Sequence, residues 1–236
     1  MANTNFNFMR VELEPAYILH TRAYRETSLL VYALTRQYGV MHMVSRGARK
    51  KGTQLQPFMK MHLSWTGRGE LVSLNKFEIE QSSYKRDFYT HVQCFYLHEL
   101  ILSLIPKMSP EPDLFLLYEE TLASITKYPL KEAILRKYEL RILAISGHPL
   151  QLQFDHSNDK PVEDDLQDRY EPGLGPVQCN TRYADWNIVS GHLLRCLDNH
   201  EFHEDILPQA KKFLRGLIKY HLQGKPLMTR QLLRAG

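Results

Sequence analysis

Short apolar segments occupy the first third of the chain, and their spacing predicts β-strands. The segments are rich in β-branched and aromatic residues and are separated by polar residues; they lie at 16–21, 28–35, 40–45, 61–66 and 70–80. A Gly-Arg-Gly sequence at 67–69 marks a tight turn before the last segment. Because no long helix interrupts these strands, we expect them to form a small closed or nearly closed barrel.

From residue 88 onward, the apolar positions recur with the longer period of a helix. The pattern predicts helices at 88–105, 113–128, 130–146, 185–199 and 205–222. Pro106 stops the first of these, and Gly147 follows the third, as is usual at helix ends. The sequence therefore predicts an α+β protein, with a strand-rich domain at 1–84 and a mostly helical domain at 85–236.

The segment 155–176 departs from both patterns. It carries seven carboxylates, is rich in glycine and proline, and has few apolar residues. This composition favours a mobile surface loop inside an irregular insertion at 148–183. The alternative is chelation of a divalent ion, although the carboxylates lack the alternation and central glycine of a calcium-binding loop.

The composition is typical of a soluble intracellular protein. Hydrophobic residues make up 43% of the 236 residues, and the formal net charge is +4, so local clusters must hold any anionic partner. Cys94, Cys179 and Cys196 have no disulfide-framework spacing, which favours a reducing compartment. Cys94 lies in an apolar stretch and is expected to be a buried, inert thiol. No apolar run is long enough for a membrane span or a signal peptide, so we expect a cytoplasmic protein without membrane contact.

Catalytic motifs are missing from the sequence. It contains no phosphate-binding P-loop, no dinucleotide-binding glycine pattern and no nucleophile elbow. His192, Cys196 and His200 are spaced at i, i+4 and i+8, and on one helical face they could bind zinc, which leaves a zinc hydrolase as an alternative. The other interpretation is a polar face opposite buried leucines. We therefore predict a non-enzymatic protein with no cofactor and no bound metal.

Two groups of cationic residues indicate an anionic partner. The first occupies a loop directly after a predicted strand and contains Arg46, Arg49, Lys50 and Lys51, with Arg68 in the turn at 67–69. The second forms one stripe on a predicted helix and contains Lys211, Arg215 and Lys219. Such clusters attract a polyphosphate by charge neutralisation and counterion release, although a cationic stripe can also be only a solvated helix face.

Aromatic residues in the barrel would extend this interaction to bases. Basic loops and exposed aromatic side chains suit single-stranded nucleic acid, because bases stack without sequence preference. Tyr24, Tyr38 and Trp65 are the candidates, and Trp65 is better explained as a core residue.

An ordered set of stretches runs through the chain: YILHTRAYRETSLLVYALTRQYG at 17–39, SRGARKK at 45–51, LQPF at 55–58, WTGRGEL at 65–71 and GKPLMTRQLL at 224–233. Together they resemble the RecO family of bacterial DNA repair proteins, over nearly the whole length of the chain. The resemblance implies an N-terminal five-stranded OB-type (oligonucleotide-binding) barrel, a helical C-terminal domain and non-catalytic work on DNA.

The resemblance also implies partners. Members of the family bind single- and double-stranded DNA and anneal single strands, and with RecR they help to load RecA onto DNA coated by the single-stranded-DNA-binding protein. Some members carry two CxxC pairs that form a zinc ribbon in the insertion. Here Cys179 is the only cysteine of that region, so we expect no ribbon zinc.

The resemblance further implies a site for the acidic C-terminal tail of the single-stranded-DNA-binding protein. That tail ends in an apolar residue and a free carboxylate, so it needs a cation beside an apolar groove. Arg136 shares a predicted helix face with Leu140 and Leu143, with Lys137 at the rim, which makes this face a candidate. One alternative is that another helix covers the leucines. For the function of the whole protein, the alternative to DNA binding is a protein-interaction scaffold whose basic faces bind only acidic protein segments.

Overall fold

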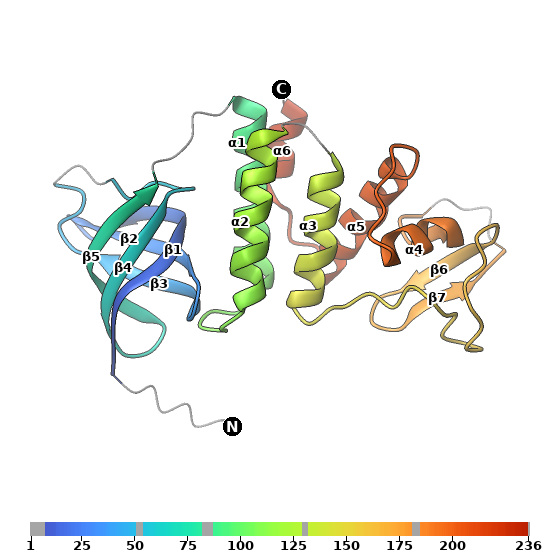
Figure 1. Cartoon of the computed structure of the whole chain (residues 1–236), viewed down its shortest axis with the longest axis horizontal. Coiled ribbons are helices and arrows are strands. Elements are labelled where there is room, and N and C mark those ends of the chain that lie inside the picture. Colours follow the sequence, from blue (N-terminus) through green and yellow to red (C-terminus); the bar gives the residue numbers. More distant parts are fainter. Residues whose placement is uncertain (1–7, 51–53, 82–86, 129–131, 181–184, 236) are drawn as a thin grey trace. The chain divides into compact units, whose positions relative to one another are not determined.

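The computed structural model describes residues 8–50, 54–81, 87–128, 132–180 and 185–235 (Figure 1). The chain divides into two compact units. The first unit comprises Met1–His98 and Ile105–Glu119, and the second comprises Glu99–Leu104 and Glu120–Gly236. The boundary that the sequence predicts, between residues 84 and 85, lies outside the described residues.

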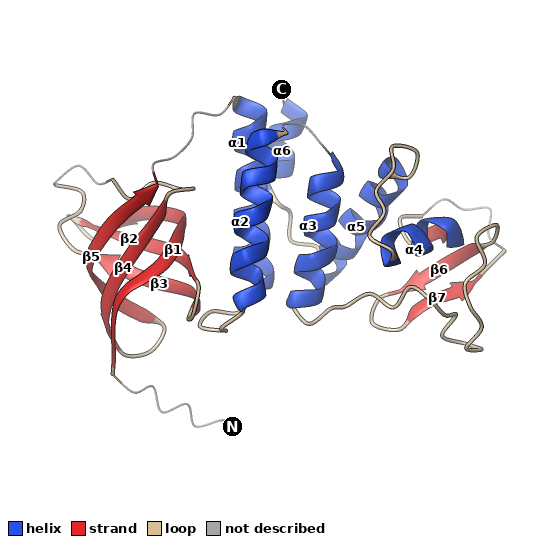
Figure 2. Ribbon diagram, in the orientation of Figure 1, coloured by secondary structure: helices blue, strands red, loops and turns tan. Residues whose placement is uncertain are grey.

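The first unit contains a closed five-stranded barrel (Figure 2). Its strands are β1 (Met9–Tyr24), β2 (Ser28–Thr35), β3 (Gly39–Ser45), β4 (Lys60–Gly67) and β5 (Leu71–Gln81). Around the barrel they follow the order β1-β2-β3-β5-β4, in which β3 and β5 are parallel and the other pairs are antiparallel. This arrangement confirms the predicted OB-type barrel.

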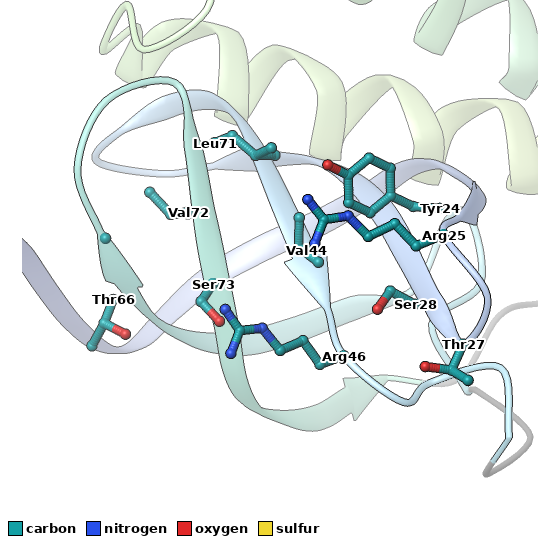
Figure 3. A pocket seen from close by; sticks show the side chains of 11 residues that line it. Tyr24, Arg25, Thr27, Ser28, Val44, Arg46, Thr66, Leu71, Val72 and Ser73 are labelled. Atoms are coloured by element: carbon teal, nitrogen blue, oxygen red, sulfur yellow. The ribbon is translucent and has the colours of Figure 1, made fainter.

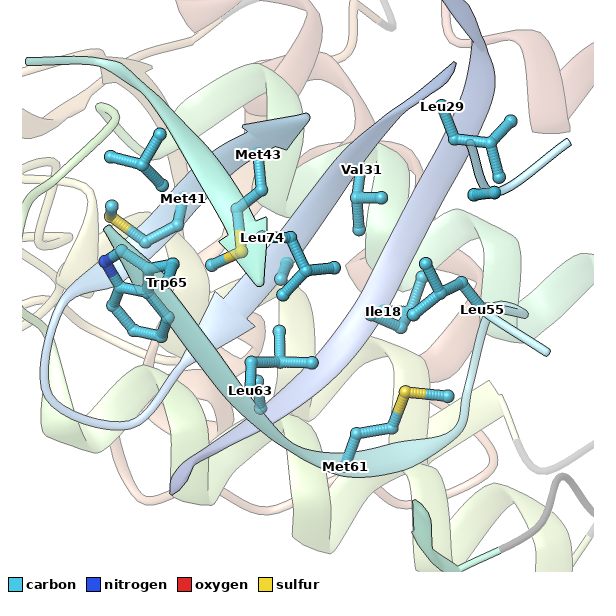
Figure 4. Close-up of a cluster of buried hydrophobic side chains, with 14 of the residues drawn as sticks. Ile18, Leu29, Val31, Met41, Met43, Leu55, Met61, Leu63, Trp65 and Leu74 are labelled. Atoms are coloured by element: carbon cyan, nitrogen blue, oxygen red, sulfur yellow. The ribbon is translucent and has the colours of Figure 1, made fainter. Parts of the chain in front are cut away.

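Alternate residues of each strand fill the barrel interior (Figure 4). Met41, Met43, Met61 and Leu63 are fully buried there. Trp65 is also fully buried, as its assignment to the core predicts, and Tyr38 packs edge-on against its ring at 5.2 Å. Burial of each such side chain contributes about 1.5–3 kcal/mol, so the barrel has its own hydrophobic core.

A bulge in β1 changes which residues of this strand face the core. Ala16 and Ile18 point into the barrel, but the pairing with β2 shifts between Ile18 and His20. After the shift, the even-numbered residues lie on the outer face, and His20 pairs with the outward-facing Tyr32. The carbonyl of Leu19 at the bulge lies 2.7 Å from Nδ1 of the buried His98. The second half of β1 therefore presents a different set of side chains to solvent.

The five predicted helices are present: α1 (Phe88–Leu104), α2 (Pro112–Lys127), α3 (Glu132–Ile145), α4 (Gly191–Asp198) and α5 (Leu207–His221). The described residues contain a further helix, α6 (Met228–Ala235), which the sequence pattern does not predict. Cys94 in α1 is fully buried, as its apolar surroundings predict. Helix α4 begins later than predicted, because residues 188–190 form a strand and Ser190 caps the helix by accepting the backbone N–H of Leu193. None of the described helices has the length and apolar character needed to cross a membrane.

The acidic segment is more ordered than its composition indicates. A three-stranded sheet of order β7-β6-β8 is formed by β6 (Gln167–Glu171), β7 (Gly175–Gln178) and β8 (Ile188–Ser190). The Asp155 carboxylate ties the preceding loop to this sheet, because it accepts the backbone N–H groups of Ser157 at 2.8 Å and Gln178 at 2.9 Å. Tyr170 packs edge-on against Phe213 of α5 at 5.0 Å. Backbone hydrogen bonds and one buried ring thus order a segment that has few apolar residues.

We predict that Gly39→Ala destabilises the protein by roughly 2–4 kcal/mol. Gly39 has a φ of +68°, and a Cβ atom there would lie 1.9 Å from the carbonyl oxygen of Ser109. Gly47→Ala is a matched control, because Gly47 has a φ of +69° but no atom within 4 Å of its Cβ position. The control should cost only about 1 kcal/mol of backbone strain. Urea unfolding of both variants measures the difference, and equal losses would contradict the steric explanation.

We also predict that Asp168→Asn stabilises the second unit at neutral pH. Asp168 is 3% exposed, and its burial together with the nearby charge of Asp155 raises the pKa of its carboxyl from 3.8 to about 6. Because the pKa of Asp168 is raised in the folded state, its contribution to the free energy of unfolding is most favourable below pH 3.8 and is lost as the pH rises through 6. Ionisation of the buried Asp168 carboxyl therefore lowers the free energy of unfolding by at most about 3 kcal/mol.

The amide that replaces the Asp168 carboxyl carries no charge, so the variant should gain up to this amount at pH 7.5 and almost nothing at pH 4. Urea unfolding followed by the fluorescence of Trp186 in a Trp65→Phe background reports on the second unit at both values. A gain that is equal at the two pH values would show that ionisation is not the cause.

Candidate nucleic-acid interface

Aromatic rings form a ladder across the outer face of the barrel. His20 on β1 lies 5.6 Å from Tyr32 on β2, and Tyr32 lies 4.4 Å from His42 on β3. The guanidinium of Arg22 lies over the Tyr32 ring at 5.8 Å. Partial burial lowers the pKa of both histidines below 6.5, and neighbouring cations lower it further. At neutral pH the ladder therefore presents uncharged rings beside a fixed cation.

A pocket of about 460 Å³ opens on the same barrel (Figure 3). The residues that line it are Tyr24, Arg25, Thr27, Ser28, Val44, Arg46, Thr66, Gly67, Leu71, Val72 and Ser73. The side chains of Arg25 and Arg46 extend into it, Arg25 on the Tyr24 side and Arg46 on the Ser73 side. The Arg25 guanidinium lies over the Tyr24 ring at 5.3 Å. The pocket therefore combines two cations, one aromatic ring and several hydroxyl groups.

The ladder and the pocket belong to one continuous surface. Residues that pair across antiparallel strands point to the same side, and Tyr24 pairs with Ser28 just as His20 pairs with Tyr32. On the parallel pair β3 and β5, His42 is in register with Leu71, which is 45% exposed. We name this surface, on the outer side of β1, β2, β3 and β5, the barrel face. In OB folds the strand 2–3 face and its loops are where oligonucleotides bind.

The charge of the barrel face suits a polyanion. None of the described residues that line the pocket is acidic. Arg25 and Arg46 can therefore bind an anion in the pocket without competition from a carboxylate there. Guanidinium groups bind phosphate oxygens through paired N–H donors, and the serine and threonine hydroxyls add further donors.

The predicted basic loop divides into residues with different tasks. Arg46 lines the pocket. Arg49 instead donates from its guanidinium to the carbonyl of Glu26 at 3.0 Å, and so holds the loop against the β1–β2 turn. Lys50 and Arg68 are exposed, and Arg68 directly follows the pocket residue Gly67. Lys51 lies outside the described residues.

The predicted stripe on α5, which lies in the second unit, is not one uniform cationic surface. Lys211 forms an ion pair with Glu132 of α3, which neutralises it locally. Arg215 is half-buried, whereas Lys219 is exposed and lines a separate cleft. Of the three predicted residues, Lys219 is therefore the one best placed to meet an anion.

The three aromatic residues predicted from the sequence lie in two different places. Tyr24 lies in the pocket, while Tyr38 and Trp65 belong to the barrel core. Five further residues of the barrel face are not among the residues predicted from the sequence: His20, Arg22, Arg25, Tyr32 and His42. The alternation of His20, Arg22 and Tyr24 along one strand was the available signal, but it required knowledge of the bulge to place them outside.

The candidate site around Arg136 needs correction. Arg136 is 1% exposed, and its Nη2 atom donates to Glu139 Oε1 at 2.6 Å. Leu140 and Leu143 are also buried, and only Lys137 is exposed. The expected surface pocket is therefore wrong, because Arg136 and both leucines are buried. A buried guanidinium is retained here because a buried carboxylate neutralises it.

The zinc alternative also fails in its geometry. The Nε2 atom of His192 lies 3.7 Å from Cys196 Sγ, but α4 ends at Asp198, so His200 does not continue the helical face. Burial raises the pKa of the Cys196 thiol, which disfavours the thiolate that zinc binds. Among the described residues, no group of three or more histidine, cysteine, aspartate or glutamate side chains is arranged to hold a metal ion.

The fold and the barrel face define a class: a nucleic-acid-binding OB barrel joined to a helical domain. Comparisons with known proteins agree. A family model described as "Recombination protein O N terminal" matches residues 9–83, and one described as "Recombination protein O C terminal" matches residues 86–231. The chain therefore belongs to the RecO family of DNA repair proteins, as the resemblance in its sequence indicates.

Three relatives that carry the name DNA repair protein RecO match over almost their full length. The protein of Nitrosococcus oceani is 37% identical over 230 residues, covering 95% of this chain and 94% of the relative. The protein of Methylococcus capsulatus is 36% identical over 233 residues, covering 96% of this chain and 94% of the relative. The protein of Marinobacter nauticus is 34% identical over 233 residues, covering 94% of each chain.

We predict that Arg25→Ala and Arg46→Ala each weaken the binding of single-stranded oligonucleotides of any sequence, because phosphates carry no sequence information. The slope of log affinity against log salt should become shallower by about 0.7 for each phosphate that is no longer neutralised. Arg10→Ala is the control, because Arg10 is exposed on the same barrel but is paired with Glu12. A fluorescence anisotropy titration at several salt concentrations gives the slopes. Equal slopes for wild type, Arg25→Ala and Arg46→Ala would exclude the pocket as a phosphate site.

Proposed function

We propose that this protein binds single-stranded DNA on its barrel face and anneals complementary strands. In this role it is a non-catalytic mediator of recombinational repair. The observation that carries the proposal is the continuity of the aromatic ladder with the arginine-lined pocket on one side of the barrel. Family membership supports the link to DNA repair.

The chemistry of the barrel face favours single strands. Unpaired bases can stack on the rings of His20, Tyr32 and His42, and stacking contributes about 1–3 kcal/mol per base. In a duplex the base faces are already covered, so double-stranded DNA would be held mainly through its phosphates by Arg25 and Arg46. The same surface thus binds both forms of DNA, but only single strands use its rings.

The proposal includes partners that the family resemblance implies. We propose that the protein acts with RecR to help load RecA onto strands coated by the single-stranded-DNA-binding protein, whose acidic tail it recruits. Because Arg136 is buried, we propose that the tail binds at a site other than Arg136. No chemical step is required of the protein, because annealing needs only that two strands be held together while their charges are neutralised. We place this work in the cytoplasm.

A scaffold that binds only acidic protein segments is the competing function. The arginine pocket alone fits either a phosphate or a carboxylate partner. The aromatic ladder favours DNA, because neutral rings contribute little to the binding of an acidic segment but provide stacking surfaces for bases.

We predict that Tyr32→Ala lowers the rate of annealing and weakens single-strand binding by at least about five-fold, the lower limit for the loss of one stacked base. Binding to duplex DNA should change little, because duplex bases do not reach the ring. Tyr89→Ala is the matched control, since Tyr89 is a 47% exposed tyrosine on α1 of the same unit.

Annealing is followed with complementary labelled strands, both bare and coated with the single-stranded-DNA-binding protein. Loss of duplex binding in parallel with single-strand binding would indicate a general electrostatic effect and contradict base stacking on Tyr32.

A further inference from the structure

The second unit contains an aromatic cleft that the barrel face does not explain. Its volume is about 920 Å³, and it is lined by His148, Trp186, Gly216, Lys219, Tyr220, His221, Gln223 and Gly224. Tyr220 is 56% exposed, and Lys219 is also exposed. Four aromatic rings and one cation therefore surround an open space whose size lies in the range of about 300–1,000 Å³ that is usual for ligand sites.

Two hydrogen bonds from side chains to backbone carbonyls hold the loop of Trp186 at this cleft. Lys212 donates from Nζ to the carbonyl of Asp185 at 2.7 Å, which fixes the loop to α5. Asn187 donates from its side-chain amide to the carbonyl of Tyr170 at 3.2 Å, which fixes the same loop to β6. The indole ring lies against Gly216, where a Cβ atom would come within 2.2 Å of it. The ring is thus supported from behind and is set in place before any ligand arrives.

The stacked rings of His148 and His221 also line the cleft. His148 follows α3, where its backbone N–H donates to the carbonyl of Leu143 at 2.9 Å. Its ring stacks on that of His221 with the centroids 3.9 Å apart and an angle of 21° between the planes. Burial and the neighbouring His148 lower the pKa of His221, so the ring of His221 is neutral at pH 7. His221 therefore contributes a flat aromatic surface rather than a second cation to the cleft.

The charges at the cleft favour an anion with aromatic groups. None of the described residues that line it is acidic, and Lys219 supplies a positive charge. Two carbonyl groups at the end of α5 are paired within the chain. The carbonyl of Lys219 accepts the N–H of Gly224 at 2.9 Å, and the carbonyl of Tyr220 accepts the N–H of Gln223 at 2.9 Å.

From this geometry we propose that the cleft is a second single-strand site, in which bases stack on Trp186 and Tyr220 while Lys219 contacts a phosphate. The inference rests on the proposed annealing function, which requires two strands to be held at once. An acidic peptide is the less suitable occupant, because a single lysine balances few carboxylates, whereas each nucleotide brings one phosphate together with one flat base.

Tryptophan fluorescence tests the proposal on the full-length protein. The chain has two tryptophans, and Trp65 is fully buried in the barrel core, so a ligand stacked in the cleft should quench Trp186. Three probes are compared: a thymidine oligonucleotide, an abasic oligonucleotide of equal length and an acidic peptide. Trp186→Phe assigns the signal, because this variant should lose the quenching while retaining an aromatic ring.

We expect the thymidine oligonucleotide to quench Trp186 strongly, and the abasic strand and the peptide to quench it little. Tyr220→Ala and Lys219→Ala should each weaken the quenching titration by at least about five-fold. Lys160→Ala is the matched control, because Lys160 is an exposed lysine of the same unit outside the cleft. Its titration should match that of the wild type.

The inference fails if the abasic strand or the peptide quenches as strongly as the thymidine strand, or if Tyr220→Ala has no effect. It also fails if no probe quenches Trp186. These results are separable from failure of the barrel face, which is measured by the salt dependence of Arg25→Ala and Arg46→Ala. Loss of the barrel-face effect with intact quenching would leave the cleft as the single-strand site and overturn the first proposal alone.

Discussion

The barrel face depends on the hydrogen bonds that hold the bulge of β1. The shift in pairing at Leu19 leaves its carbonyl directed at His98, and a carbonyl can only accept, so in the neutral ring Nδ1 carries the proton. The other ring nitrogen, Nε2, then accepts the hydroxyl of Tyr118 at 2.6 Å. Loss of such a buried partner typically costs about 1–3 kcal/mol. One histidine thus fixes both the position of the bulge and the orientation of the strand beyond it.

This bulge divides β1 into two halves with different partners. Before it, Tyr17 faces away from the barrel core and packs against Phe115 and Tyr118 of α2 at 5.5 and 5.0 Å. Beyond it, the outward positions carry His20, Arg22 and Tyr24 instead. Because side chains alternate along a strand, one extra residue reverses every position that follows. Without the bulge, these three polar and aromatic side chains would point into the hydrophobic interior.

The sequence was sufficient for the barrel strands and the long helices, but not for β6, β7, β8 and α6 or for the site. Apolar alternation located all five barrel strands, and the helical period with the stop residues Pro106 and Gly147 located the first three helices, because these signals are local. The bulge at Leu19 leaves no local mark, so His20 and Arg22 could not be placed on the surface. Arg136 shows the reverse error: its charge suggested exposure, but the partner that permits its burial, Glu139, is recognised only once the packing of α3 is known.

The composition of the barrel face also bears on how annealed DNA would leave it. Neutral rings and few arginines give each strand a modest affinity, with about 1–3 kcal/mol from each stacked base. Formation of a duplex contributes about 1.4 kcal/mol for every base-pair step and withdraws the bases from the rings at the same time. What remains is the attraction between arginines and phosphates, which salt weakens. If the protein anneals strands as proposed, pairing would remove the stacking interactions that held each strand on the protein, so product release would need no separate source of energy.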